Sequence, residues 1–206
     1  MYEVELKARI KDRKTVISTL ESFASYNGAV EKSDTYYENA GSATPVKLRL
    51  RKEIPFVSEE ISSSNQKNKI LSAPAIIFTY KKKEFKSNSR QIEINSENEC
   101  ILSDASPVEL FLNDAGFVPV LKKQKRVLSW KYQDALFELC TVMPLGDFLE
   151  IEILLDESVK TPAKIKETQN RLISLLKKCG LQESDIEKKY YSQLLNEFSS
   201  TDSISS

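Results

Sequence analysis

Residues 1–10 read MYEVELKARI, and charged and apolar side chains alternate along this stretch. The odd positions from Glu3 to Arg9 are charged, and the even positions from Tyr2 to Ile10 are apolar. A period of two is typical of a β-strand, because successive side chains of a strand point to opposite faces. The N-terminal stretch therefore predicts a strand with one charged face and one apolar face.

Three later stretches repeat this pattern. Residues 47–51 (KLRLR) place three cations on one face, and residues 79–83 (TYKKK) align two lysines with a threonine. Residues 149–153 (LEIEI) place two carboxylates opposite three aliphatic side chains. Several such strands predict an α+β fold, in which about eight antiparallel strands form a closed or nearly closed β-barrel with a charged lumen and helices packed outside.

Composition limits the function classes. A chain of 206 residues fits one domain, and 30 basic against 30 acidic residues create no overall field that would attract nucleic acid. The absence of histidine excludes Ser-His-Asp and Cys-His catalysis and imidazole metal sites. Three cysteines without CxxC spacing indicate neither a zinc site nor a disulfide framework. No apolar run approaches the ~20 residues of a membrane span, and the N-terminal strand is no signal peptide, so a cytoplasmic protein is expected.

The rest of the chain predicts one domain over residues 1–198 and a polar tail over residues 199–206. Asp12 is expected to cap a helix that runs to about Ser25. A capping box at residues 106–109 predicts a second helix, with Val108, Phe111 and Leu112 at helical spacing, and a third is expected over residues 160–178. Further strands are expected at 75–83, 90–95, 118–131, 135–142 and 148–155. Residues 57–73 are predicted to form an exposed insertion. Their composition favours a loop without a functional role, and the alternative is a flexible lid over the mouth of the lumen.

Charged strand faces that converge on one lumen would suit a polyanion and a metal ion. A polyanion has many acceptor oxygens, so several cations must approach it from different directions. By alternation, the candidate substrate-binding cations are Lys7, Lys47, Arg49, Arg51, Lys81, Lys83, Lys123 and Lys125. A hard cation such as Mg²⁺ or Mn²⁺ prefers oxygen ligands. The carboxylates available on two strands are Glu3, Glu5, Glu150 and Glu152.

The string Glu3-x-Glu5-x-Lys7 resembles the ExExK signature of the CYTH superfamily, the triphosphate tunnel metalloenzymes, which include class IV adenylyl cyclases, thiamine triphosphatases and inorganic triphosphatases. Further matches follow in the family's order and extend the resemblance over roughly residues 1–196. They are DTYY at 34–37, the basic strand 47–51, TYK at 79–81, GFVPV at 116–120, KQKR at 123–126, LGDFLEIE at 145–152 and YSQLL at 191–195.

The resemblance implies roles for individual residues. Glu3, Glu5 and Glu152 would bind the metal ion, with Glu150 as a further ligand or directly behind the site. Lys7, Arg49, Lys81 and Lys123 would contact the triphosphate, and the predicted catalytic set is Glu3, Glu5, Lys7 and Glu152. Gln91 and Glu93 share a strand face where the family often has carboxylates, so Glu93 is another candidate ligand. Residues 34–37 are expected to pack and hydrogen-bond rather than to catalyse.

Two positions depart from the family pattern. Cys140 stands where the family usually has an aspartate, and a thiol is a poor ligand for a hard cation. Glu138, two residues away on the same strand face, is therefore a candidate ligand for the same ion. Lys125 stands where the family often has arginine, and a lysine cannot make the bidentate phosphate contact that an arginine makes.

The resemblance implies a Mg²⁺- or Mn²⁺-dependent enzyme acting on a small-molecule triphosphate. The opening strand, the chain length and residues 191–195 favour a class IV adenylyl cyclase, in which the metal activates the 3′-hydroxyl of ATP and pyrophosphate leaves. The alternative is a triphosphatase acting on inorganic triphosphate, thiamine triphosphate or a nucleoside triphosphate. The departures at Cys140 and Lys125 leave open a third interpretation, a triphosphate- or polyphosphate-binding module with little or no turnover. Members of the family are often dimeric, so a homodimer is also open.

Overall fold

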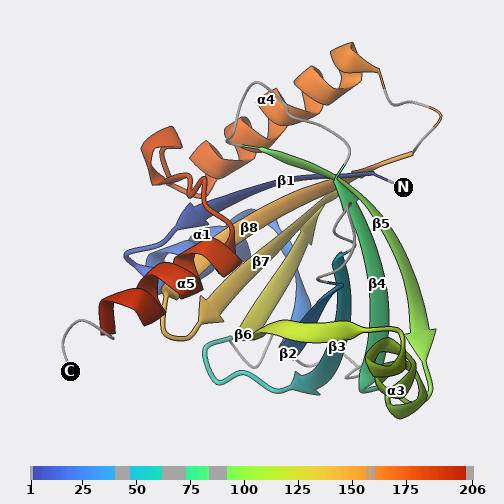
Figure 1. The fold of residues 1–206 in the computed structure, drawn as a ribbon. Helices are drawn as coiled ribbons and strands as arrows, with labels where there is room; N and C mark the ends of the chain where they lie inside the picture. The colour runs from blue at the N-terminus through green and yellow to red at the C-terminus, as the bar shows by residue number, and fades with distance from the viewer. Residues whose placement is uncertain are drawn as a thin grey trace.

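The protein is an eight-stranded antiparallel barrel with helices on its outside (Figure 1). The computed structural model describes residues 2–39, 47–61, 73–83, 92–156, 158 and 161–202. The strands are β1 (Tyr2–Arg9), β2 (Ser25–Asn39), β3 (Lys47–Phe56), β4 (Ala75–Lys83), β5 (Glu93–Leu102), β6 (Phe117–Tyr132), β7 (Ala135–Val142) and β8 (Gly146–Leu155). The helices are α1 (Arg13–Phe23), α3 (Ser106–Asp114), α4 (Pro162–Lys178), α5 (Tyr191–Asp202) and the 3₁₀ turn η2 (Glu183–Asp185).

The strands pair in the order β1-β5-β4-β3-β2-β6-β7-β8, and β8 pairs again with β1. The β1–β8 register runs over the whole of β1, from Tyr2 opposite Leu155 to Arg9 opposite Phe148. The β1–β5 register is much shorter and runs only from Tyr2 opposite Ser96 to Glu5 opposite Glu93. The ring is therefore closed through a short seam, which confirms the predicted closed or nearly closed barrel.

The main hydrophobic core lies between the outside of the barrel and the helices. Val4 and Leu6 of β1 are fully buried there, together with Leu172 and Leu176 of α4. Helix α4 lies across β1 and β8 (Figure 1). Full burial of one such aliphatic side chain contributes about 1.5–3 kcal/mol. Because the apolar faces of β1 and β8 are held against α4, the charged faces of these strands must point into the lumen.

Helix ends are partly as predicted. The Asp12 carboxylate accepts a hydrogen bond from the Thr15 backbone N–H at 3.1 Å, which confirms the expected cap of α1. The capping box predicted at residues 106–109 is wrong, because Ser106 already lies inside α3 and its N–H donates to Asp104 at 3.0 Å. Of the apolar residues at helical spacing in α3, Leu112 is buried, but Phe111 is 67% exposed.

Three segment boundaries also differ from the prediction. Strand β5 continues to Leu102 because it pairs with β4 as far as Ile76. At the start of the expected exposed insertion, Val57, Glu59 and Glu60 are exposed, whereas Ser58 and Ile61 are buried and Ile61 belongs to the main core. Residues 62–72 lie outside the described residues, so the rest of the insertion stays a prediction. The predicted polar tail begins inside α5, which extends to Asp202. Within the described segments, no helix has the length and hydropathy needed to cross a membrane.

Candidate functional site

The lumen holds a cavity of about 620 Å³. The predicted site residues that line it are Glu3, Glu5, Lys7, Arg49, Arg51, Lys123, Lys125, Glu138, Glu150 and Glu152. For the other predicted site residues, Lys47, Lys81, Lys83 and Glu93, the structure describes the backbone and not the side chain. Their backbone register places Lys47 opposite Lys81 and Glu93 opposite Glu5.

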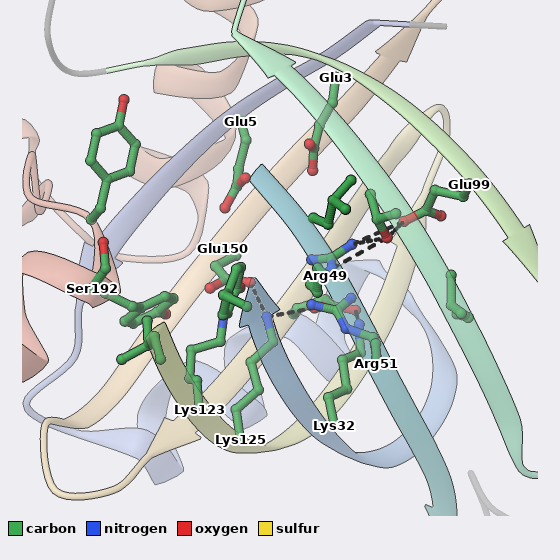
Figure 2. A pocket seen from close by; sticks show the side chains of 18 of the residues that line it. Glu3, Glu5, Lys32, Arg49, Arg51, Glu99, Lys123, Lys125, Glu150 and Ser192 are labelled. Atoms are coloured by element: carbon green, nitrogen blue, oxygen red, sulfur yellow. Dashed lines mark hydrogen bonds and ion pairs between the residues drawn. The ribbon is translucent and has the colours of Figure 1, made fainter. Parts of the chain in front are cut away.

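The two signs of charge are partly sorted between the strands. Strands β1, β7 and β8 contribute five of the eight carboxylates that line the cavity, and Glu38, Glu53 and Glu99 come from β2, β3 and β5, whereas β2, β3 and β6 contribute most of the cations. Figure 2 shows Glu3 and Glu5 across the cavity from Arg51, Lys32 and Lys125. This sorting follows from strand order, because strands that are neighbours in the barrel present their lumen faces side by side.

Asp34 of β2 is a buried acid that holds the cationic wall together. Its Oδ1 accepts from Arg51 Nε at 2.7 Å, and its Oδ2 accepts from Arg51 Nη2 at 3.1 Å. Oδ2 also lies 3.1 Å from Lys123 Nζ and 3.2 Å from the Tyr36 hydroxyl. Burial by itself would raise the pKa of Asp34, but Lys123 and Arg51 hold that pKa well below its usual range. Asp34 is therefore ionised and orients two cations of the lumen.

Arg49 is oriented from the other side of the wall, by β4 and β5. Its Nη2 lies 3.0 Å from Thr79 Oγ1 and 2.9 Å from Glu99 Oε1, and Thr79 Oγ1 donates to the same Glu99 oxygen at 2.8 Å. Pairing between β3, β4 and β5 brings these three residues together. Asp34, Thr79 and Glu99 were not assigned to the site from the sequence. The signal that could have found them is alternation, which places each of them on the lumen face of its strand.

A second charge cluster lies deeper, between β6, β7 and β8. Lys125 Nζ is 2.6 Å from Glu150 Oε2 and 3.4 Å from Glu138 Oε2. The other Glu138 oxygen accepts from Lys32 Nζ at 2.5 Å. Burial opposes ionisation of Glu138, but Lys32 and Lys125 outweigh it and lower its pKa to about 2. Glu150 likewise has a pKa well below its usual value, because Lys125 and Lys123 outweigh its burial.

Cys140 lies beside this cluster and begins the closed end of the lumen. It is fully buried with Val127, Phe148 and Leu194, in an apolar cluster that joins the barrel to α5. Burial, followed by the charge of Glu150, raises the pKa of the Cys140 thiol well above its usual value. Cys140 is therefore a neutral thiol, and its end of the lumen is filled by side chains.

The carboxylates at the β1–β8 boundary have a different environment. Glu5 lies directly opposite Glu152 in the register. Burial and the charge of Glu138 raise the pKa of Glu152, whereas a hydrogen bond with Glu3 partly offsets this. Carboxylates in such close contact share a proton or a cation. Glu3, Glu5 and Glu152 offer carboxylate oxygens, the donor type that a hard divalent ion prefers, whereas the described residues whose donor atoms lie within 4.8 Å of one another are Glu138, Cys140 and Glu150.

The start of α5 also reaches the lumen. Tyr191 places its ring 4.3 Å from Lys7 Nζ and 5.0 Å from Lys123 Nζ, which is cation–π geometry. Lys7 Nζ donates to the Lys189 carbonyl at 2.7 Å. The motif at 191–195 was noticed in the sequence, but only the structure shows that Tyr191, which contacts Lys7 and Phe148, lines the cavity together with Ser192.

Comparison with known proteins identifies one family and several solved structures with a similar fold. The family model described as CYTH domain matches residues 1–191. No match was found among curated proteins. Among solved structures, the PH1012 protein of Pyrococcus horikoshii is 26% identical, with a TM-score of 0.70, and the match covers 93% of this chain and 98% of that one.

Two more distant structures have the same fold. A candidate adenylate cyclase from Vibrio parahaemolyticus is 15% identical, with a TM-score of 0.67 and coverage of 95% of this chain and 98% of that one. The protein HpAC1 from Hippeastrum, described as an adenylyl cyclase candidate with a dominant triphosphatase activity, is 14% identical. Its TM-score is 0.53, with coverage of 87% of this chain and 88% of that one.

Proposed function

The chain belongs to the CYTH family, and we propose that it is a divalent-metal-dependent enzyme that acts on a triphosphate group. The observation that carries this proposal is the cavity itself, in which most of the cations, on β2, β3 and β6, lie across from the carboxylates of β1, β7 and β8. A bare polyanion would be repelled by the carboxylates, and a metal ion alone would be repelled by the cations. A triphosphate with its bound divalent ion satisfies both walls at once.

The cations would bind the phosphate oxygens. Arg49 and Arg51 present planar guanidinium groups, which suit paired phosphate oxygens, and Lys123 and Lys7 add point charges. Asp34, together with Thr79 and Glu99, holds the arginines in place before substrate enters. Such preorganisation lowers the ordering cost of binding.

Glu3, Glu5 and Glu152 would hold the divalent ion at the β1–β8 boundary. When bound there, Mg²⁺ or Mn²⁺ neutralises charge on the phosphate oxygens and makes the attacking oxygen more acidic. The protein residues fix the position of the triphosphate against the carboxylate wall, and the apolar cluster of Cys140, Val127 and Phe148 keeps water from the closed end.

The leading reaction is that of a class IV adenylyl cyclase, which converts ATP to cyclic AMP and pyrophosphate. The cavity volume of about 620 Å³ is within the usual range for a pocket that encloses an organic ligand, and Ile77, Leu136 and Leu154 add apolar lining that would suit a base or sugar. The second candidate is a triphosphatase, and the activity named for HpAC1 favours it.

Product analysis tests these reactions. The purified protein is incubated with Mg²⁺ or Mn²⁺ and with ATP, inorganic triphosphate or thiamine triphosphate, and the products are separated and identified. Cyclic AMP with pyrophosphate supports the cyclase, and orthophosphate supports the triphosphatase. Saturable binding without products would support the binding module, whereas neither binding nor turnover of any triphosphate would refute the proposal.

A further inference from the structure

One group of potential metal ligands lies apart from the proposed ion. Glu138, Cys140 and Glu150 each offer one donor atom, and these atoms lie within 4.8 Å of one another. Glu138 and Glu150 are directly opposite each other on β7 and β8, so the backbone itself enforces their proximity. Two carboxylates and a thiol at this spacing could in principle hold a second divalent ion.

The structure instead places an ammonium group at this position. Lys125 starts opposite Val142, two pairs beyond Cys140, and its side chain reaches back to both carboxylates, at 2.6 Å from Glu150 and 3.4 Å from Glu138. Lys125 is only 6% exposed, so its charge is removed from water and depends on these two acids. Lys32 takes the remaining oxygen of Glu138.

A divalent ion would compete poorly for this cluster. It would have to displace the buried ammonium of Lys125, or lie beside it against like-charge repulsion. Its third ligand would be the thiol of Cys140, which is a soft donor in a place where Mg²⁺ or Mn²⁺ prefers oxygen. Glu3, Glu5 and Glu152 offer three oxygen ligands from β1 and β8.

We infer that Lys125 acts as a built-in cation between Glu138 and Glu150, so that the lumen binds one divalent ion, at Glu3, Glu5 and Glu152, and not two. The single ion rests on the proposed function, whereas the role of Lys125 rests on the ion pairs alone. Lys125 is then a positioning residue that neutralises the deep carboxylates, and Glu138 is not a ligand of the ion.

Counting bound Mn²⁺ by electron paramagnetic resonance, on the full chain without substrate, tests this inference. The wild type and Glu138→Gln should each bind one Mn²⁺ per chain, and Glu152→Gln should lose it. Lys125→Met should bind two, because removal of the ammonium leaves Glu138 and Glu150 without their shared cation. The matched variant Lys125→Arg keeps the positive charge and should bind one.

Cadmium gives an independent spectroscopic signature, because it binds thiolates and produces a charge-transfer band. The assay uses a Cys100→Ser background, since Cys100 is exposed and would bind cadmium by itself. The band should be absent with Lys125 in place and appear in Lys125→Met. It should disappear again in Lys125→Met/Cys140→Ser, which separates Cys140 from the remaining Cys179.

Two Mn²⁺ ions in the wild type, with one lost in Glu138→Gln, would overturn the inference. A folded Lys125→Met that gains neither a second Mn²⁺ nor the cadmium band would also overturn it. If Lys125→Met does not fold, the wild type and Glu138→Gln decide: one ion in both upholds the inference. Failure of the proposed function is distinguishable, because no ion in the wild type with one gained in Lys125→Met refutes metal dependence while upholding the role of Lys125.

Discussion

Asp34→Asn should be among the most destabilising single changes in the lumen, although asparagine has nearly the same shape. Asp34 Oδ1 accepts from Arg51 Nε, and Oδ2 accepts from Arg51 Nη2, Lys123 and Tyr36. Every neighbour is a donor, so the amide NH₂ of asparagine must face a donor in either orientation. The change also leaves two buried cations without their shared counter-ion.

Breaking a buried ion pair costs about 3–5 kcal/mol. For a domain of this size, each kcal/mol lowers the melting temperature by about 2–4 °C. The expected loss in Asp34→Asn is therefore about 6–20 °C, measured by thermal unfolding at neutral pH. Glu31→Gln is the matched control on the same strand: Glu31 pairs with Arg126 at the surface, so its loss should be below about 1 kcal/mol.

A polyanion should reverse part of this effect. Millimolar inorganic triphosphate should raise the melting temperature of Asp34→Asn more than that of the wild type, because it pairs with the cations that Asp34 no longer holds. A loss below about 1 kcal/mol in Asp34→Asn, or an equal shift by triphosphate in both proteins, would refute the view that Asp34 organises the cationic wall.

Three further predictions concern pH, substrate binding and the closed end of the lumen. The pKa of Asp34 is lowered in the folded state, so ionised Asp34 stabilises the fold above its unfolded pKa of about 3.9, and this stabilisation is lost as pH falls below that value. The difference in melting temperature between the wild type and Asp34→Asn should therefore be constant above about pH 5 and narrow below about pH 4. Arg49→Lys should raise KM for the triphosphate about tenfold or more, since lysine cannot form the paired contacts, whereas Arg126→Lys on the barrel exterior should leave KM unchanged in the same steady-state assay. Cys140→Asp should lower the melting temperature in metal-free buffer by several degrees, because it adds a third buried carboxylate beside Glu138 and Glu150. The control Cys140→Ser adds no charge and should lower the melting temperature less. Equal shifts in the two variants would contradict repulsion between the buried carboxylates as the cause.

The sequence predicted the barrel because its information is local. Alternation of charged and apolar residues in 1–10, 47–51 and 149–153 marks which face of each strand meets the helices, and the lumen face follows from it. The same argument placed Glu3, Arg49 and Glu152 in the lumen, where the structure has them. Local patterns failed where burial depends on distant segments: Phe111 has helical spacing but is exposed, and Ile61 belongs to the main core.

Only the tertiary structure decided which charge neutralises which. Alternation gives Glu138 and Glu152 the same kind of lumen position, yet one is held by two lysines and the other lies against carboxylates. Which acid meets which cation depends on strand order and register around the whole barrel and on how far a lysine reaches along the lumen. These quantities are set by pairings between residues far apart in the chain, such as Lys32 with Glu138, and no local pattern contains them.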